Sequence, residues 1–525
     1  MKHMFVRASF VKASLQILIA TLALFGLLEI LFRFVGAPGA GRFVEEIVIK
    51  ERLNRWKPEG EIRIFTFGES TMQGAHYAPV STPARWLRVY LKEFLPDQKV
   101  RVIDFSRLGC GSDFILRAFK STLIYKPDIA FFYMGHNVFL PGGRKDRVVA
   151  ERARLGRRID FLSRRSYFIS TVHRWVIQIA MRRSRKKTEE SFGYKVVETP
   201  PVGAKSEDMI PRGSPVYWEN IDFFKANVDQ ILAAAKEKGI RALFFMPVSN
   251  LKDFAPSYSF HRKDLAPEAL SRWDELYQAG VEKQAHGDLS AALELEEQAY
   301  AIDSNYADLS FRLGQLYFKT GDLGKARKLF EEARDRDVPV VRATKDVLAA
   351  LDELKEREGL ELIDIEKILV SEAPGGILGE PIIEDNVHLS VKGHSLMGWT
   401  MAEEIANRNW IRPKTQWRFD QIRPFGEIAA ELGVNNDLLF SADLKMASYF
   451  GSRFENRIRY AERALTIHPG DPYALRHLAW AYWLMGEHVE ALEIYRKLEK
   501  INPGALEEVF ALQPEIKKAF RSPSL

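Results

Sequence analysis

The chain has 525 residues, of which 46% are hydrophobic and 28% charged; this predicts two to four folded domains and excludes a largely disordered chain. Its single cysteine, Cys110, excludes an intramolecular disulfide and a cysteine-based zinc site. The net charge of +6 arises in one segment, because residues 144–187 hold 15 Lys or Arg against 3 acidic residues. The rest of the chain carries about −6, so the net charge gives no reason to expect nucleic-acid binding.

Residues 13–32 form an apolar stretch, ASLQILIATLALFGLLEILF, in which only Gln16 and Glu29 are strongly polar. Twenty helical residues span roughly 30 Å, the thickness of the hydrocarbon core of a bilayer. Lysine and arginine precede the stretch, so the positive-inside rule places the N-terminus in the cytoplasm and the remaining chain outside it, in the periplasm. A cleaved signal peptide is the alternative, but its apolar region is usually only about 7–15 residues long. We therefore expect a single-pass membrane anchor.

From residue 62 onward, apolar segments of strand length alternate with amphipathic segments of helix length. The segment 128–135, DIAFFYMG, is almost wholly apolar, as is typical of a strand covered on both faces. Five such strands separated by helices predict an α/β domain with a parallel, doubly wound sheet. The expected strands are 62–68, 99–106, 128–135, 240–250 and 360–365, with helices at 83–95, 113–125, 227–239 and 347–359.

A repeat with a period of 34 residues interrupts this region at 272–338. Gly280 recurs as Gly314, and Ala292 recurs as Ala326. A period of 34 residues with small side chains where helices cross is the signature of tetratricopeptide (TPR) repeats. We therefore predict two TPR units inserted into an α/β domain that extends over 62–410.

A second TPR-like region is expected at 440–510, where Pro469 and Pro503 lie 34 residues apart. Stacked helix pairs leave a concave surface suited to a protein partner, or they simply brace the α/β domain. The other insertion, 144–187, combines basic residues with a helical pattern. It predicts either a solvated face or contact with an anionic membrane, an acidic polymer or a membrane protein.

Polar residues follow four of the predicted strands, where each strand ends. Ser70 follows the first strand, Gly109 the second, Asn137 the third, and Asp385 with His388 the last. The carboxyl ends of parallel strands meet along one rim, where ligands bind. These residues supply a hydroxyl, backbone N–H groups, an amide, an acid and an imidazole, which are the groups that acyl transfer requires.

These blocks resemble those of the SGNH/GDSL hydrolase family, in particular a membrane-anchored branch with TPR repeats. The resemblance extends over 62–402 and implies a three-layer α/β/α, flavodoxin-like domain. The matching blocks are Gly68-Glu69-Ser70, Gly109 five residues after Asp104, Gly135-His136-Asn137-Val138, and Asp385-Asn386-Val387-His388.

The resemblance also implies a role for each site residue. Ser70 would attack an ester carbonyl, His388 would take up the hydroxyl proton, and Asp385 would hold the other ring nitrogen. The Ser70 and Gly109 N–H groups and the Asn137 amide would bind the oxyanion. No cofactor is implied, and we find no metal-ligand spacing, so we predict no metal.

Each residue also has an interpretation without chemistry. Ser70 could cap a helix, and Asp385 could cap the helix that follows it. Cys110 is expected to be a small packing residue. Two positions depart from the family pattern, which usually has Asp at the places of Glu69 and Val138; we expect altered loop packing there.

Two functions are compatible with these patterns. The first is a membrane-anchored SGNH-type serine esterase or O-acyltransferase that acts on ester groups outside the cytoplasm, with O-acetylated cell-surface glycans as candidate substrates. The second is a TPR scaffold protein of an envelope or polysaccharide-export complex that retains a vestigial hydrolase domain.

Overall fold

The computed structural model describes residues 40–139, 210, 212–338, 340–450 and 454–521. The predicted membrane helix 13–32 and the basic insertion 144–187 lie outside these residues, so both remain predictions. Among the residues that are described, none of the helices is long and apolar enough to cross a membrane.

The predicted sheet is confirmed: five strands form one wholly parallel sheet in the order β2-β1-β3-β4-β5. In this order the chain reverses its winding between β1 and β3, and ligands of doubly wound folds bind above such a reversal. All five expected strands are present, although the last is only two residues long. The strands are β1 (Ile62–Gly68), β2 (Val100–Asp104), β3 (Ile129–Tyr133), β4 (Arg241–Phe245) and β5 (Leu362–Ile363).

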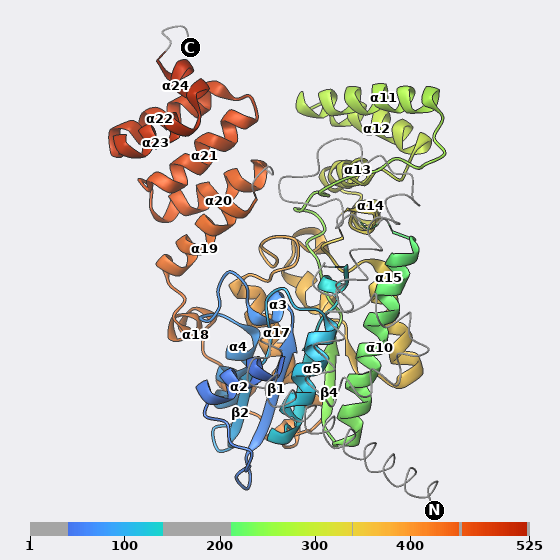
Figure 1. Cartoon of the computed structure of the whole chain (residues 1–525), viewed down its shortest axis with the longest axis vertical. Coiled ribbons are helices and arrows are strands. Elements are labelled where there is room, and N and C mark those ends of the chain that lie inside the picture. The colour runs from blue at the N-terminus through green and yellow to red at the C-terminus, as the bar shows by residue number, and fades with distance from the viewer. Residues whose placement is uncertain (1–39, 140–209, 211, 339, 451–453, 522–525) are drawn as a thin grey trace, which may run out of the picture.

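Helices cover both faces of this sheet, which gives three layers (Figure 1). Side chains alternate along a strand, so Phe131 of β3 packs with the helices of one face and Phe132 with those of the other. The first face carries α4 (Pro83–Phe94) and α17 (Val391–Asn407). The second face carries α2 (Ala40–Lys50), α5 (Ser112–Thr122), α10 (Pro215–Glu237) and α15 (Lys345–Glu358).

The α/β unit begins earlier in the chain than the expected boundary at residue 62. Helix α2 packs on α5 and buries Ala40 and Val44 in the same cluster as the sheet. This burial shows that the segment before β1 belongs to the domain core.

The inserted repeats form two antiparallel helix pairs. The glycines of the 34-residue period lie where paired helices touch: a Cβ on Gly280 would come within 2.7 Å of Glu296, and a Cβ on Gly314 within 2.7 Å of Phe330. The period therefore reflects a requirement for close helix contact. The helices are α11 (Pro267–Ala285), α12 (Leu289–Ile302), α13 (Ala307–Thr320) and α14 (Leu323–Arg336).

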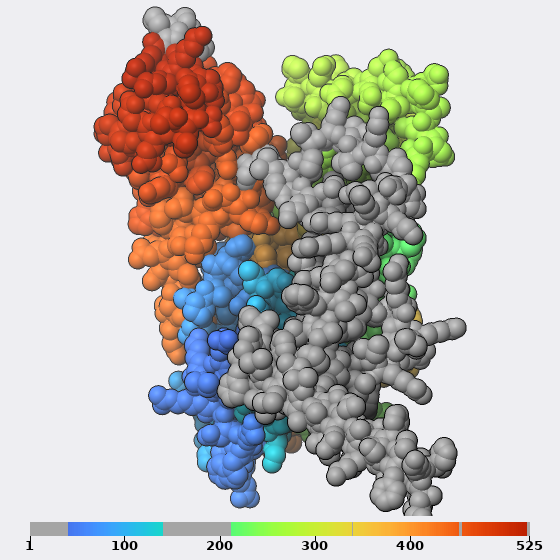
Figure 2. All heavy atoms as spheres, viewed as in Figure 1, coloured from blue at the N-terminus to red at the C-terminus, as the bar shows by residue number. Residues whose placement is uncertain are grey.

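The C-terminal region forms a second helical array, which extends beyond the expected range of 440–510. Both arrays lie on the side of the sheet to which the strand carboxyl ends point (Figure 1), and Figure 2 shows them as separate lobes. After the linking helix α18 (Phe425–Leu432), the array contains α19 (Asn436–Tyr449), α20 (Phe454–Ile467), α21 (Pro472–Leu484), α22 (His488–Ile501), α23 (Pro503–Leu512) and α24 (Pro514–Phe520).

Candidate active site

Ser70 lies at the sharp turn between β1 and the short helix α3 (Ser70–Gln73). Gly68 makes this turn possible, because a Cβ at that position would lie 2.7 Å from the carbonyl oxygen of Tyr133 in β3. The N-cap position of α3 belongs to Glu69, so the Ser70 hydroxyl does not serve as the cap. Ser70 Oγ instead lies 2.6 Å from Nε2 of His388.

His388 and Asp385 lie on the loop before α17. Nδ1 of His388 is 2.5 Å from Oδ2 of Asp385, so the three predicted residues form one chain of contacts. The other carboxylate oxygen, Oδ1, accepts the backbone N–H groups of Val387 and His388 at 3.0 and 2.8 Å. The loop therefore fixes the carboxylate and the imidazole in one orientation.

The Asp385 carboxylate is fully buried and stays ionised. Burial acts to raise its pKa, but the charge and hydrogen bonds of His388 and His76 hold the pKa well below its usual range. Because an ionised carboxylate can only accept, Nδ1 of His388 carries a proton and Nε2 is free to accept the Ser70 proton. This is the tautomer that a general base at Ser70 requires.

Asn137 follows β3 within the short helix η2 (His136–Phe139). Its Nδ2 donates to the carbonyl oxygen of Cys110 at 2.8 Å, and Cys110 is the neighbour of Gly109. This bond uses one of the two amide protons and ties the loops after β2 and β3 together. Cys110 therefore links Asn137 and Gly109, two of the predicted oxyanion donors. Cys110 is itself buried, as expected of a packing residue.

We expect Asn137→Ala to lower kcat on p-nitrophenyl acetate by about 100- to 1,000-fold with little change in KM, the usual cost of one oxyanion donor. Asn305→Ala is a matched control, since Asn305 also donates Nδ2 to a carbonyl oxygen but lies in the inserted repeats. A loss confined to KM, or equal kcat in the two variants, would remove Asn137 from the oxyanion site.

Glu69 is a residue whose role the sequence did not reveal. Its carboxylate accepts the backbone N–H groups of Gly135, His136 and Asn137 at 3.0–3.2 Å. The side chain is 1% exposed. The longer side chain at the usual Asp position thus holds the backbone of the loop that carries Asn137.

His76 is a second such residue. Its Nε2 lies 2.9 Å from Oδ2 of Asp385, the oxygen that also contacts His388. His76, Asp385 and His388 are the group of described residues that could hold a metal ion, because their donor atoms all lie within 4.8 Å of one another. A cation there would have to displace both imidazole contacts to Asp385, so we identify none of the three as a metal ligand.

Helix α20 of the C-terminal array contacts the same loop through Glu384. The Glu384 carboxylate accepts from Tyr77 Oη at 2.7 Å and from Arg463 Nη1 at 2.8 Å, and the Tyr460 hydroxyl donates to its backbone carbonyl. Arg463 also pairs with Asp443 of α19 at 3.0 Å. The C-terminal array therefore braces the residue next to Asp385.

We expect Arg463→Met to lower the melting temperature and to reduce kcat severalfold. The change leaves Glu384 and Asp443, both nearly buried, without a shared cation. Breaking a buried pair costs about 3–5 kcal/mol, and partial exposure of Arg463 reduces this to about 1–3 kcal/mol. Arg476→Met, which breaks an exposed pair with Glu508, is the control in thermal unfolding and kinetics. Equal losses of melting temperature and kcat in the two variants would show that the contact between Arg463 and Glu384 does not stabilise the Ser70 site.

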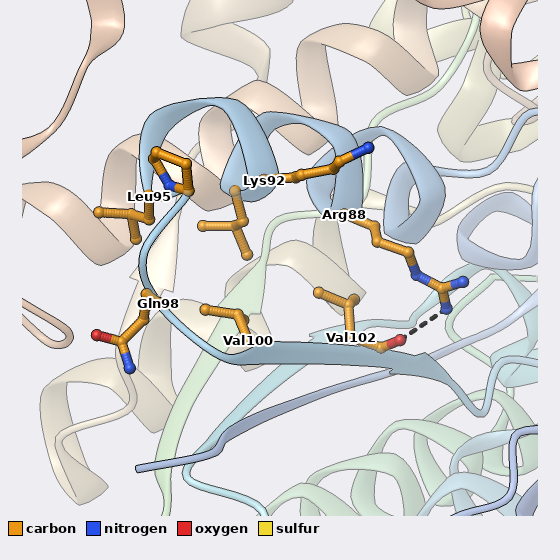
Figure 3. A pocket seen from close by; sticks show the side chains of 8 residues that line it. Arg88, Lys92, Leu95, Gln98, Val100 and Val102 are labelled. Carbon is orange, nitrogen blue, oxygen red and sulfur yellow. Dashed lines mark hydrogen bonds between the residues drawn. The ribbon is translucent and has the colours of Figure 1, made fainter.

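A separate hollow lies between α4 and the edge strand β2, where Arg88 Nη2 donates to the Val102 carbonyl oxygen at 2.7 Å (Figure 3). Its lining contains none of the site residues described above. The hollow is therefore unrelated to the Ser70 site.

Two family models for tetratricopeptide repeats match the chain, one over residues 284–351 and one over residues 453–505. These matches confirm the predicted repeats in both the insertion and the C-terminal array. A comparison with curated proteins finds no match.

The chain is similar to solved structures of ester hydrolases. A GDSL-like lipase from Bacteroides thetaiotaomicron is 9% identical with a TM-score of 0.31, covering 70% of this chain and 99% of its own. A lipase/acylhydrolase from Enterococcus faecalis is 11% identical with a TM-score of 0.28, covering 66% and 96%. An acetylxylan esterase from Geobacillus stearothermophilus is 10% identical with a TM-score of 0.29, covering 69% and 97%.

Proposed function

We propose that this chain is an SGNH-type serine esterase or O-acyltransferase, anchored in a membrane by residues 13–32 and acting on ester groups outside the cytoplasm. The observation that carries the proposal is the continuous contact from Ser70 Oγ through His388 to Asp385, at 2.6 and 2.5 Å. The Asn137 amide, at the end of a neighbouring strand, supplies the group that such chemistry needs for an oxyanion.

In the first half of the reaction, Ser70 Oγ forms a bond to the ester carbonyl carbon while its proton moves to Nε2 of His388. The carbonyl electron pair becomes an oxyanion, which the Asn137 amide stabilises. The positive charge on His388 is balanced by Asp385. Collapse of the intermediate breaks the ester C–O bond, and the departing alkoxide takes the proton from Nε2, leaving an acyl group on Ser70.

In the second half, water or a sugar hydroxyl attacks the acyl group, and His388 takes up and returns the proton as before. Hydrolysis and transfer therefore share every residue named above. They differ only in the acceptor that reaches the acyl-enzyme.

Acetate release tests the enzymatic proposal. The full chain in detergent should release acetate from p-nitrophenyl acetate and from an O-acetylated glycan, and Ser70→Ala should not. To detect transfer, an unacetylated oligosaccharide is added and its mass is measured by mass spectrometry. Each acetyl group that replaces a hydroxyl hydrogen raises this mass by about 42 Da. Equal release by wild type and Ser70→Ala would sink the esterase proposal.

The proposed location rests on the sequence of the N-terminal stretch. Residues 13–32 are apolar and follow basic residues, which supports an anchor with the catalytic domain outside the cytoplasm. O-acetylated cell-surface glycans are the substrates that we propose for a domain in that location. A reporter fused after Leu525 that is active only in the cytoplasm tests the orientation, and a positive signal would reverse it.

A scaffold role is the second candidate, because two TPR-type arrays are present and α20 contacts the loop beside Asp385. It predicts that a cell carrying only Ser70→Ala behaves as one carrying the wild type. The esterase proposal predicts that the two cells differ in the acetate content of their surface glycans.

A further inference from the structure

His76 is brought to the Ser70 site by a left-handed backbone conformation that residues other than glycine adopt uncommonly. Its φ is +77°, in the left-handed region that favours glycine. Such residues persist only where the surrounding structure holds them, and they cluster at functional sites. The conformation places Nε2 of His76 2.9 Å from Oδ2 of Asp385.

The neighbouring residues repeat the contact. Tyr77 Oη donates to Glu384 at 2.7 Å, so the adjacent pair His76-Tyr77 faces the adjacent pair Glu384-Asp385. The backbone N–H of Ala75 is bonded to the carbonyl oxygen of Ser70 at 3.0 Å, which fixes the start of this segment to the nucleophile. The segment from Ser70 to Tyr77 therefore links the nucleophile directly to the Asp385 carboxylate, which Ser70 otherwise reaches only through His388.

The hydrogen bonds of Asp385 leave a defined role for His76. Oδ1 accepts two backbone N–H groups, and Oδ2 faces both imidazoles. Because the carboxylate only accepts, His76 must donate from Nε2. The rings of His76 and His388 are perpendicular, with centroids 4.8 Å apart, so the two donors approach Oδ2 from different directions.

We propose that His76 is a positioning residue for the reaction proposed above: its Nε2–H holds Oδ2 of Asp385 in line with Nδ1 of His388. The inference rests on the esterase proposal. With Oδ2 held in place, the Asp385 carboxylate stays aligned with His388 while His388 takes up the Ser70 proton.

Two variants of the full chain test the proposal with p-nitrophenyl acetate as substrate. His76→Leu removes the donor and should lower kcat about 10- to 100-fold, the usual effect of losing a partner that orients a reacting group, with KM unchanged. His76→Gln keeps an N–H donor that cannot ionise. It should recover most of kcat, because the donor to Oδ2 of Asp385 is kept. His286→Gln, at an exposed position in the inserted repeats, is the control.

A wild-type kcat in His76→Leu would overturn the proposal. So would a His76→Gln variant that loses as much kcat as His76→Leu. If His76→Leu fails to fold, a folded His76→Gln variant with kcat more than about 10-fold below wild type overturns the proposal as well. Loss of wild-type activity on dialysis against EDTA, with recovery on adding zinc, would make His76 a metal ligand and also overturn it. Failure of the esterase proposal is a separate result, because Ser70→Ala would then hydrolyse the substrate as fast as wild type.

Discussion

Replacing Ser70 with alanine should abolish labelling by a fluorophosphonate and lower kcat for ester hydrolysis by roughly 10⁴- to 10⁶-fold, the range found when a serine nucleophile is removed. The physical reason is that His388 then has no hydroxyl from which to take a proton. The measurement is in-gel fluorescence of the probe together with steady-state kinetics. Ser121→Ala, at a half-exposed position on α5, is the matched control and should label like wild type.

A double variant tests whether the site acts as one unit. Ser70→Ala combined with His388→Ala should be no slower than Ser70→Ala alone, because residues that act in one step are not additive. If the second change costs a further factor similar to its own single effect, His388 acts on the substrate independently of Ser70. Equal labelling of wild type and Ser70→Ala would remove the nucleophile from the mechanism altogether.

The strands could be predicted because they are buried on both faces. The run Phe131-Phe132 is apolar on both sides of the sheet, so it needs no alternation to be recognised. The α2 helix lies before the predicted boundary at residue 62, because the burial of Ala40 and Val44 depends on α5 beside them. Boundaries of this kind depend on packing between segments far apart in the chain.

The residues at the strand ends could be predicted for a related reason. A parallel sheet brings the carboxyl ends of its strands to one rim, which places Ser70 after β1 beside Asn137 after β3. The His388 loop reaches the same rim only through the longer segment between β5 and α17. Glu69 left one signal, a carboxylate directly after the buried strand β1. His76 left none, because its reach to Asp385 depends on a left-handed backbone that no local residue pattern requires.

Replacing Glu69 with alanine should give the second large effect. Three backbone N–H groups of the loop that carries Asn137 would lose their acceptor, at about 1–3 kcal/mol each. We therefore expect a loss of stability on the order of 5 kcal/mol and a lower kcat, because the amide is no longer held. Glu69→Gln keeps one acceptor oxygen and should be milder in both respects. Thermal unfolding and kinetics measure the two effects.

The pH dependence of Glu69 gives a sharper test. Burial raises the pKa of Glu69 from 4.5 to about 8, although the three N–H groups act to lower it. Between these values the folded chain holds a proton that the unfolded chain has released. The stability from this group is therefore complete below pH 4.5 and is lost as the pH rises through 8.

The melting temperature of wild type relative to Glu69→Gln should consequently fall by several degrees between pH 5 and pH 9, conditions that span roughly the window set by the two pKa values. Groups common to both proteins cancel in this difference. Glu356→Gln, at an exposed position on α15, should show no such trend. A difference that instead grows with pH would mean that the three N–H groups outweigh burial. Glu69 would then be an ionised anchor, and its negative charge would lie one residue from Ser70, where it would oppose the oxyanion that the site must stabilise.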